Sequence, residues 1–160
     1  MVKSMKVHLG PRVEVRIYGG PYYEKPADMG GVRMAAELDI PADAVVPVRD
    51  FGVPGKTHYR ALYGALLFAL YGLSKGREVY VGCMGGVGRT GLFLALLARC
   101  LDVISPIAYV REQYSPRAVE TPEQEAFVRD FDLAPLGPAI KGAIQRAERR
   151  RGIAIGLNVV

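Results

Sequence analysis

The most informative stretch of the chain is Val81-Gly82-Cys83-Met84-Gly85-Gly86-Val87-Gly88-Arg89-Thr90-Gly91. A β-type segment, residues 78–82, leads into it, and a strongly apolar helical segment, residues 92–101, leads out of it. We therefore expect a turn between a strand and a helix, with a cysteine thiol near its start and an arginine where the helix begins.

This turn has the composition of an anion-binding loop. Its glycines allow successive backbone N–H groups to point inward, and the N-terminus of the following helix adds partial positive charge. Arg89 can hold two phosphate oxygens in its planar fork. A thiol in such a field should be ionised near neutral pH. Cys83 is therefore expected to be a nucleophile directed at phosphorus.

The C-x5-R spacing of Cys83 and Arg89, followed by Thr90, resembles the signature loop of the cysteine-dependent protein tyrosine phosphatase superfamily. Arg49-Asp50-Phe51-Gly52-Val53-Pro54 resembles the mobile loop of that family that carries the general-acid aspartate. Val119-Glu120-Thr121-Pro122-Glu123-Gln124 resembles the later loop that positions the hydrolytic water. The three motifs occur in the family's order over roughly half of the chain, and they imply a compact, dual-specificity-like phosphatase.

The resemblance implies a role for each matching residue. Cys83 would attack the phosphorus, and Asp50 would protonate the leaving oxygen and then act as base. Thr90 would donate to the sulfur, and Gln124, with Glu120, would position water. The phosphate is expected in the loop formed by Met84, Gly85, Gly86, Val87, Gly88 and Arg89.

Two features of these motifs leave alternatives open. Thr121-Pro122-Glu123-Gln124 also has the pattern of a helix capping box, which would give Thr121 and Gln124 a structural role. Gly82 stands where the family usually has a histidine that fixes the loop and supports the thiolate. An active enzyme and a catalytically impaired phosphate-binding module both fit this departure.

Two other phosphate-binding loops are excluded by their context. Gly86-Val87-Gly88-Arg89-Thr90-Gly91 matches the G-x-G-x-x-G pattern, but an apolar helix follows instead of a second strand ending in an acidic residue. A Walker loop fails because Cys83 and Arg89 occupy its glycine and lysine positions.

Composition narrows the class of protein further. The 160 residues suit one domain, residues 1–160, with residues 152–160 expected as a loose C-terminal tail. The net charge of +5 favours anionic partners, so an RNA 5′-phosphatase remains an alternative. With only two cysteines and two distant histidines, we expect no disulfide framework, no metal site and no cofactor. A reactive thiolate needs a reducing compartment, and neither a signal peptide nor a membrane span is evident, so we expect a cytoplasmic location.

The periodicity predicts an α/β fold with a mainly parallel central sheet flanked by helices, which is the fold that the resemblance also implies. Strands are expected at residues 13–18, 35–38, 44–48 and 78–82, and residues 21–34 are expected to form a loop. Helices are expected at residues 57–74, 92–101, 106–114, 123–131 and 139–151, the first with leucines 62, 66, 67, 70 and 73 on one buried face.

The expected activity is metal-independent hydrolysis of phosphotyrosine in proteins, with phosphoserine and phosphothreonine as further substrates, through a cysteinyl-phosphate intermediate. Met84 and Val87 carry no charge, unlike the lysine-bearing loops of phosphoinositide phosphatases, which argues against inositol lipids.

Overall fold

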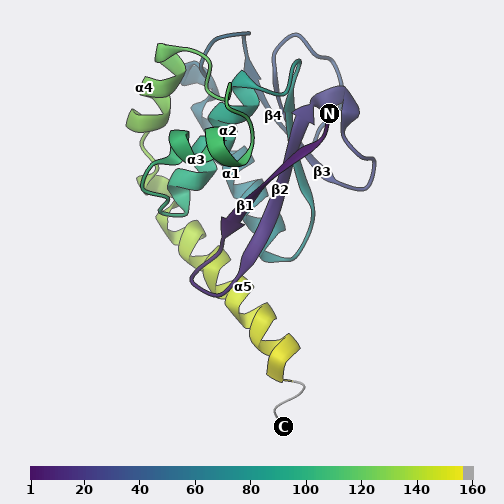
Figure 1. The fold of residues 1–160 in the computed structure, drawn as a ribbon, viewed down its shortest axis with the longest axis vertical. Helices are drawn as coiled ribbons and strands as arrows, with labels where there is room; N and C mark the ends of the chain where they lie inside the picture. The colour runs from purple at the N-terminus through teal and green to yellow at the C-terminus, as the bar shows by residue number, and fades with distance from the viewer. Residues whose placement is uncertain (157–160) are drawn as a thin grey trace.

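A single five-stranded sheet forms the centre of the computed structural model, which describes residues 1–156 (Figure 1). The strands follow the spatial order β1-β2-β5-β3-β4. They comprise β1 (Lys3–His8), β2 (Glu14–Pro21), β3 (Gly30–Ala35), β4 (Ala44–Val48) and β5 (Val79–Cys83). Only the β1–β2 pair is antiparallel, so the prediction of a mainly parallel sheet is confirmed.

Five α-helices pack around this sheet: α1 (Tyr59–Ser74), α2 (Gly88–Cys100), α3 (Pro106–Gln113), α4 (Pro122–Asp130) and α5 (Gly137–Gly156). Short 3-10 turns, η1 (Tyr22–Glu24), η2 (Lys56–His58) and η3 (Ala134–Leu136), lie between them. Helix α1 packs on the sheet and against α5, whereas α2 packs on β5 and β3 and contacts α3 and α4.

The middle strand β5 places the decisive stretch at the centre of the domain. All five of its residues are buried, as expected for a strand covered on both faces. Every residue of α2 except Arg99 is buried as well. Because parallel strands direct their C-terminal ends to one edge of the sheet, Cys83 lies at the edge where ligands bind in open α/β sheets.

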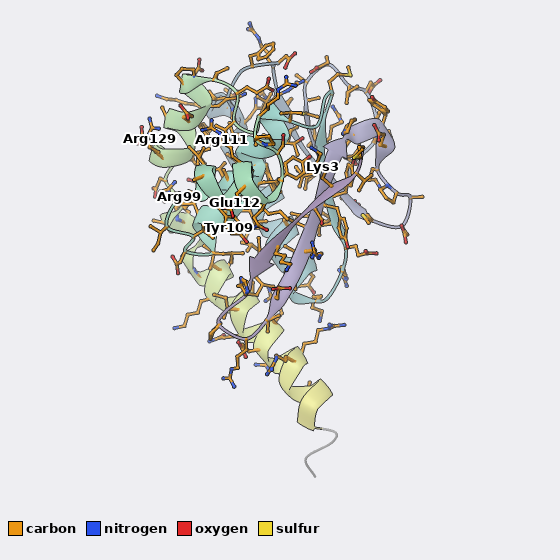
Figure 2. The ribbon with its side chains drawn as sticks, viewed as in Figure 1. Lys3, Arg99, Tyr109, Arg111, Glu112 and Arg129 are labelled. Atoms are coloured by element: carbon orange, nitrogen blue, oxygen red, sulfur yellow. The ribbon has the colours of Figure 1, made fainter. Side chains whose placement is uncertain are left out.

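Side chains tie the outer helices to this core (Figure 2). The Tyr109 hydroxyl on α3 donates to the Lys6 carbonyl oxygen of β1 at 2.6 Å. Arg99 of α2 donates to the Val128 and Phe131 carbonyl oxygens at the end of α4, at 3.1 and 2.5 Å. The helices that flank the decisive loop are therefore fixed to the sheet and to one another.

Several expected boundaries are wrong. Residues 21–34, expected as a loop, contain η1 and strand β3, and the strand expected at residues 35–38 ends at Ala35. Glycines 30 and 31 suggest a turn in the sequence, but a side chain at Gly31 would overlap the Tyr22 hydroxyl, so glycine is needed there for packing. Strand β1 was not expected from the sequence at all.

The C-terminal segment also differs from the prediction. Residues 152–156, expected as part of a loose tail, continue helix α5, which extends beyond the body of the domain (Figure 1). The rest of that expected tail, residues 157–160, lies outside the described residues.

In α1 the leucines at 62, 66, 70 and 73 are buried, but Leu67 is 40% exposed because it lies beyond the edge of the apolar face.

Two further expectations concern helix ends and membranes. Helix α3 begins at Pro106 as predicted, but the Ser105 side chain makes no capping hydrogen bond. Along residues 1–156, no helix combines the length and the apolar character that a bilayer span requires.

Candidate active site

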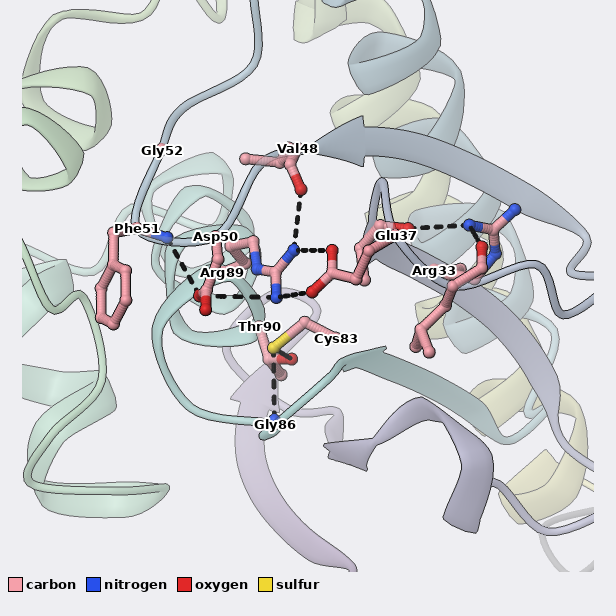
Figure 3. Close-up of polar contacts among 12 residues, drawn as sticks. Arg33, Glu37, Val48, Asp50, Phe51, Gly52, Cys83, Gly86, Arg89 and Thr90 are labelled. Atoms are coloured by element: carbon pink, nitrogen blue, oxygen red, sulfur yellow. Dashed lines mark hydrogen bonds and ion pairs between the residues drawn. The ribbon is translucent and has the colours of Figure 1, made fainter.

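The loop between β5 and α2 holds the Cys83 sulfur between two donors (Figure 3). The Gly86 N–H and the Thr90 hydroxyl both donate to Sγ at 3.2 Å. The thiol is 3% exposed, so these donors act in a largely water-excluded place. Two donors directed at one sulfur stabilise negative charge on it.

The path of this loop depends on glycine and on a buried tyrosine. Gly86 has φ +72°, and a Cβ there would overlap the backbone of Gly20 and Pro21. The Tyr114 hydroxyl donates to the Gly86 carbonyl oxygen at 2.6 Å. Burial raises the pKa of Tyr114 above its ordinary value, so this side chain remains a donor. The end of β2 and Tyr114 thus hold the loop from two sides.

Arg89 is buried and bound to a glutamate that the sequence reasoning did not identify. Its Nη1 and Nη2 donate to the two carboxylate oxygens of Glu37 at 2.6 and 2.7 Å (Figure 3). Nη1 also donates to the Val48 carbonyl oxygen at 2.8 Å. A guanidinium has five N–H groups, so Nε–H and the second N–H of Nη2 form the edge that a substrate oxyanion can use.

The electrostatics of this pair keep both groups charged. Burial, the largest single influence, lowers the pKa of Arg89, but the hydrogen bonds to Glu37 together with the nearby Cys83, Glu37 and Asp50 outweigh burial and raise the pKa above its ordinary value. The same hydrogen bonds hold the pKa of Glu37 at about 2, below its ordinary value of 4.5.

Glu37 lies in the turn after β3, and Arg33 fixes that turn by donating to the Ala35 and Leu38 carbonyl oxygens. The order of the strands in the sheet brings this turn next to α2. Glu37 therefore could not be identified from the sequence as the partner of Arg89.

Replacing Glu37 by glutamine should lower the stability of the folded protein. Arg89 is only 2% exposed, so it would lose its charged partner in a buried place. Because Glu37 is 39% exposed, water screens the pair, and we expect a loss of about 1 kcal/mol, or about 2–4 °C in Tm. Thermal unfolding followed by circular dichroism measures the change, with exposed Glu112→Gln as the control.

The same pair predicts a pH dependence. A carboxyl whose pKa is depressed on folding stabilises the fold above its unfolded value, here 4.5, and the contribution is lost as the pH falls through about 2. The Tm difference between wild type and Glu37→Gln should stay constant from pH 7 to 5 and shrink towards pH 2. A difference that is unchanged at low pH would contradict the role given to the ion pair.

Asp50 reaches the site from the turn after β4. Its Oδ1 lies 3.5 Å from Nη2 of Arg89 and accepts the Phe51 N–H at 3.0 Å. Phe51 has φ +62°, an uncommon conformation for a bulky residue, and its ring is 57% exposed. The side chain of Asp50 is 59% exposed, so it can exchange protons with solvent.

Gln124 joins the two loops that flank the thiol. Its side chain is fully buried, and its Nε2 donates to the Gly52 carbonyl oxygen at 3.0 Å. Its Oε1 accepts the Glu120 N–H at 2.7 Å. The Thr121 hydroxyl accepts the Gln124 N–H at 3.1 Å, so the predicted N-cap is confirmed, although the reciprocal bond goes to Glu120 instead of Thr121. The positioning of water by Gln124 stays a prediction.

A cavity of about 260 Å³ lies at the C-terminal edge of the sheet. Cys83, Arg89 and Asp50 line it, together with Phe51, Arg117 and Glu120. Of the residues expected to cradle phosphate, Met84, Gly85, Val87 and Gly88 also line the cavity. Gly86 does not line the cavity; its N–H is directed at the sulfur. Tyr22 is buried and Tyr23 is exposed, and neither lines the cavity.

The packing around position 82 explains why glycine stands there instead of the histidine that is usual in the phosphatases this loop resembles. A Cβ at this position would lie 2.7 Å from the Gly20 carbonyl oxygen and 2.7 Å from the Tyr22 Cα. The backbone at the end of β2 therefore fills the space that a histidine side chain would need. Tyr80 supports this segment, because its hydroxyl donates to the Pro21 carbonyl oxygen at 2.8 Å.

The chemistry available at the site comes from side chains and backbone amides. Among the described residues, no three histidine, cysteine, aspartate or glutamate side chains converge as a metal-binding group. The cavity instead combines a sulfur held by donors, a buried guanidinium with one free edge and an exposed carboxyl group.

Comparison with known proteins adds relatives and structural neighbours. No family model matches the chain. Two uncharacterized proteins of Methanocaldococcus jannaschii, MJECL20 and MJ0215, are 46% and 44% identical to it over 86 residues, which is 54% of the chain. That alignment covers 56% and 52% of their lengths, so the chain spans about half the length of the curated relatives it matches.

Solved structures resemble about four fifths of the chain. Kinase associated phosphatase (KAP), with its catalytic-site cysteine substituted by serine, superimposes with a TM-score of 0.62 at 15% identity, covering 82% of this chain and 93% of KAP. Tk-PTP in its active form superimposes with a TM-score of 0.52 at 23% identity, covering 79% of this chain and 95% of Tk-PTP. The chain therefore has the α/β fold of the protein tyrosine phosphatases, with a mainly parallel sheet that delivers Cys83 to its C-terminal edge.

Proposed function

We propose that the protein is a metal-independent phosphoester hydrolase that acts on phosphotyrosine in proteins through a cysteinyl-phosphate intermediate. One observation carries this proposal. The sulfur of Cys83, held by two donors, belongs to a residue that lines the same cavity as Asp50 and Arg89. A nucleophile, a proton donor and an oxyanion-binding group thus meet at one place.

In the first step the Cys83 sulfur forms a bond to phosphorus while the bond to the leaving oxygen breaks. Asp50, in its protonated form, gives its proton to that oxygen. Nε–H of Arg89 and the unused N–H of Nη2 hold equatorial oxygens, where negative charge must be stabilised. The bond to Glu37 keeps this edge of the guanidinium aimed at the loop.

In the second step water attacks the phosphorus and the sulfur–phosphorus bond breaks. The Asp50 carboxylate takes the proton from water, and the sulfur leaves as a thiolate. The Thr90 hydroxyl donates to this sulfur and stabilises its charge. Phosphate is released and the site returns to its starting state.

The rim of the cavity supports an aromatic phosphoester as substrate. Phe51 and Met84, which line the cavity from two different loops, are 57% and 42% exposed. Exposed apolar side chains in the cavity lining can contact the ring of a phosphotyrosine.

The proposal is tested by hydrolysis of p-nitrophenyl phosphate in buffer with a metal chelator, followed by a rapid quench, proteolytic digestion and mass measurement of the enzyme's peptides. Turnover together with one phosphoryl group on the peptide containing Cys83 is expected. A panel of phosphotyrosine, phosphoserine and phosphothreonine peptides and triphosphate-ended RNA then ranks substrates by kcat/KM. Phosphopeptide binding without turnover would contradict the enzymatic proposal, and a preference for RNA would contradict the substrate proposed.

Replacing Asp50 by asparagine should lower kcat for a phosphotyrosine peptide by about 10²–10³-fold, because the leaving oxygen would lose its proton donor. The loss should be smaller for p-nitrophenyl phosphate, whose leaving group is more acidic and needs less protonation. Steady-state kinetics with both substrates measures the difference, and exposed Asp28→Asn serves as the control. An equal loss for both substrates would contradict the role of Asp50 as general acid.

A further inference from the structure

A groove leads from the candidate active site to a second pocket between α1 and α4. The pocket has a volume of about 570 Å³ and is lined by residues of α1, of α4 and of the turn after α4. A further hollow, of about 710 Å³, follows the loop of Asp50. This hollow shares Asp50 and Phe51 with the catalytic cavity and Val53 and Glu123 with the second pocket. The three hollows therefore adjoin one another on one surface.

The wall of the second pocket, called here the aromatic pocket, is formed by four packed rings. Phe131 lies at the centre, with its ring centroid 5.0 Å from that of Tyr59, 5.0 Å from that of Tyr63 and 4.9 Å from that of Phe127. The Tyr63 hydroxyl also donates to the Asp132 carbonyl oxygen at 2.5 Å. The wall is thus formed before any ligand binds, which lowers the entropic cost of binding.

The charge of the aromatic pocket is opposite to that of the whole chain. Its charged lining residues are Glu123, Asp130 and Asp132, all acidic and exposed, whereas the chain carries a net charge of +5. The ion pairs found among residues 1–153 do not include them. Asp130 ends α4 and Asp132 stands two residues later, and a carboxylate at a helix C-terminus opposes the macrodipole. Their position therefore favours an external cation over a role in helix stability.

We propose that this groove binds the polypeptide segment that flanks the phosphorylated residue of a protein substrate, with an arginine or lysine side chain in the aromatic pocket. This inference rests on the proposed function and adds a substrate class to it. The aliphatic stem of such a side chain packs on apolar walls, and its cationic head can lie over an aromatic face. Asp130 and Asp132 complement the charge of that head.

The experiment uses phosphotyrosine peptides that carry a single arginine at successive positions on each side of the phosphotyrosine. At one position, arginine should raise kcat/KM about tenfold over alanine, and glutamate there should lower it. The Asp130→Asn, Asp132→Asn double variant should reduce this preference to about twofold or less. The asparagine at 132 can still accept the Ala134 N–H that Asp132 Oδ1 accepts at 2.9 Å, so folding should be retained. Hydrolysis of p-nitrophenyl phosphate should be unchanged.

The matched control is the double variant Asp102→Asn, Glu112→Gln. It changes the net charge by the same amount at two exposed residues that do not line the groove, and it should keep the arginine preference. If the control loses the preference equally, or if no position prefers arginine while p-nitrophenyl phosphate is still hydrolysed, the inference is wrong. A shift in the sedimentation coefficient of the Asp130, Asp132 double variant would assign the groove to a second copy of the chain and would also overturn it.

The two proposals can fail separately. If the wild-type protein hydrolyses no phosphoester, the proposed function is wrong, and fluorescence-anisotropy binding of the same peptides then tests the groove without turnover. Tighter binding of the arginine peptide to wild type than to the Asp130, Asp132 double variant would support the groove, and equal binding would refute it.

Discussion

Replacing Cys83 by serine should reduce kcat for p-nitrophenyl phosphate by about 10⁴-fold or more and leave the fold intact. A serine hydroxyl is a far weaker nucleophile than a thiolate, and single removal of a nucleophile can eliminate most of an enzyme's rate enhancement. The Gly86 N–H and the Thr90 hydroxyl, both 3.2 Å from the sulfur, can still donate to a serine oxygen. Steady-state kinetics and thermal unfolding measure the two expectations.

The second cysteine provides a matched control. Cys100 is 5% exposed on α2, and burial raises its pKa to about 12, so it is protonated and unreactive at neutral pH. Cys100→Ala should therefore keep its turnover number per folded molecule. Equal hydrolysis by wild type and Cys83→Ser would refute the nucleophile assigned to the site.

The serine variant should also retain oxyanion binding. Arg89, the loop amides and the start of α2 remain in place, so tungstate or phosphate should still bind in a calorimetric titration. A variant that binds oxyanion and hydrolyses nothing separates the nucleophile from the phosphate cradle. Loss of both properties would indicate that the loop itself had been disrupted.

Replacing Gly82 by alanine is expected to be the most destabilising of these substitutions. The added Cβ would lie 2.7 Å from the Gly20 carbonyl oxygen and 2.7 Å from the Tyr22 Cα, which are backbone atoms that cannot rotate away. Overpacking of this kind should cost about 3 kcal/mol. In a domain of this size that corresponds to a fall in Tm of about 6–12 °C, measured by calorimetry.

Gly85 offers the control for this prediction because it lies in the same loop and a Cβ there would meet nothing within 4 Å. Gly85→Ala should keep the wild-type Tm within about 2 °C. If Gly82→Ala is as stable as Gly85→Ala, the close packing of β2 against the loop is wrong. In that case the space for the histidine usual in the family would exist.

The sequence predicted the loop correctly because its geometry is local. Cys83, Arg89 and Thr90 lie within eight consecutive residues, so a strand end and a helix start place them around one point whatever the rest of the chain does. Asp50 could be named from its motif, but only the order of β5, β3 and β4 brings its turn to within 3.5 Å of Arg89. Short-range spacing therefore predicts that Cys83, Arg89 and Thr90 lie together. The distance between Asp50 and these residues is set by the order of the strands in the sheet.

Strand boundaries were predicted less well, for a physical reason. Strand β3 contains two glycines that resemble a turn, yet they are required where Tyr22 approaches the strand. Strand β1 is stabilised by its antiparallel pairing with β2 along Lys3 to His8, and this gain depends on the partner strand and not on the propensity of the segment itself.

Short-range spacing is enough to place a thiol, a guanidinium and helix-start amides in one loop, because all of them are neighbours in the chain. The groups that hold that loop come from distant segments and depend on tertiary packing. Glu37 binds Arg89 from the turn after β3, the backbone of Gly20 and Tyr22 fills the space beside Gly82, and Gln124 joins two loops. The aromatic pocket likewise combines Tyr59 and Tyr63 of α1 with residues that follow them by 60 positions or more. Such contacts arise from the packing of the sheet and helices, which depends on the free energy of the whole chain and not on any one stretch of it.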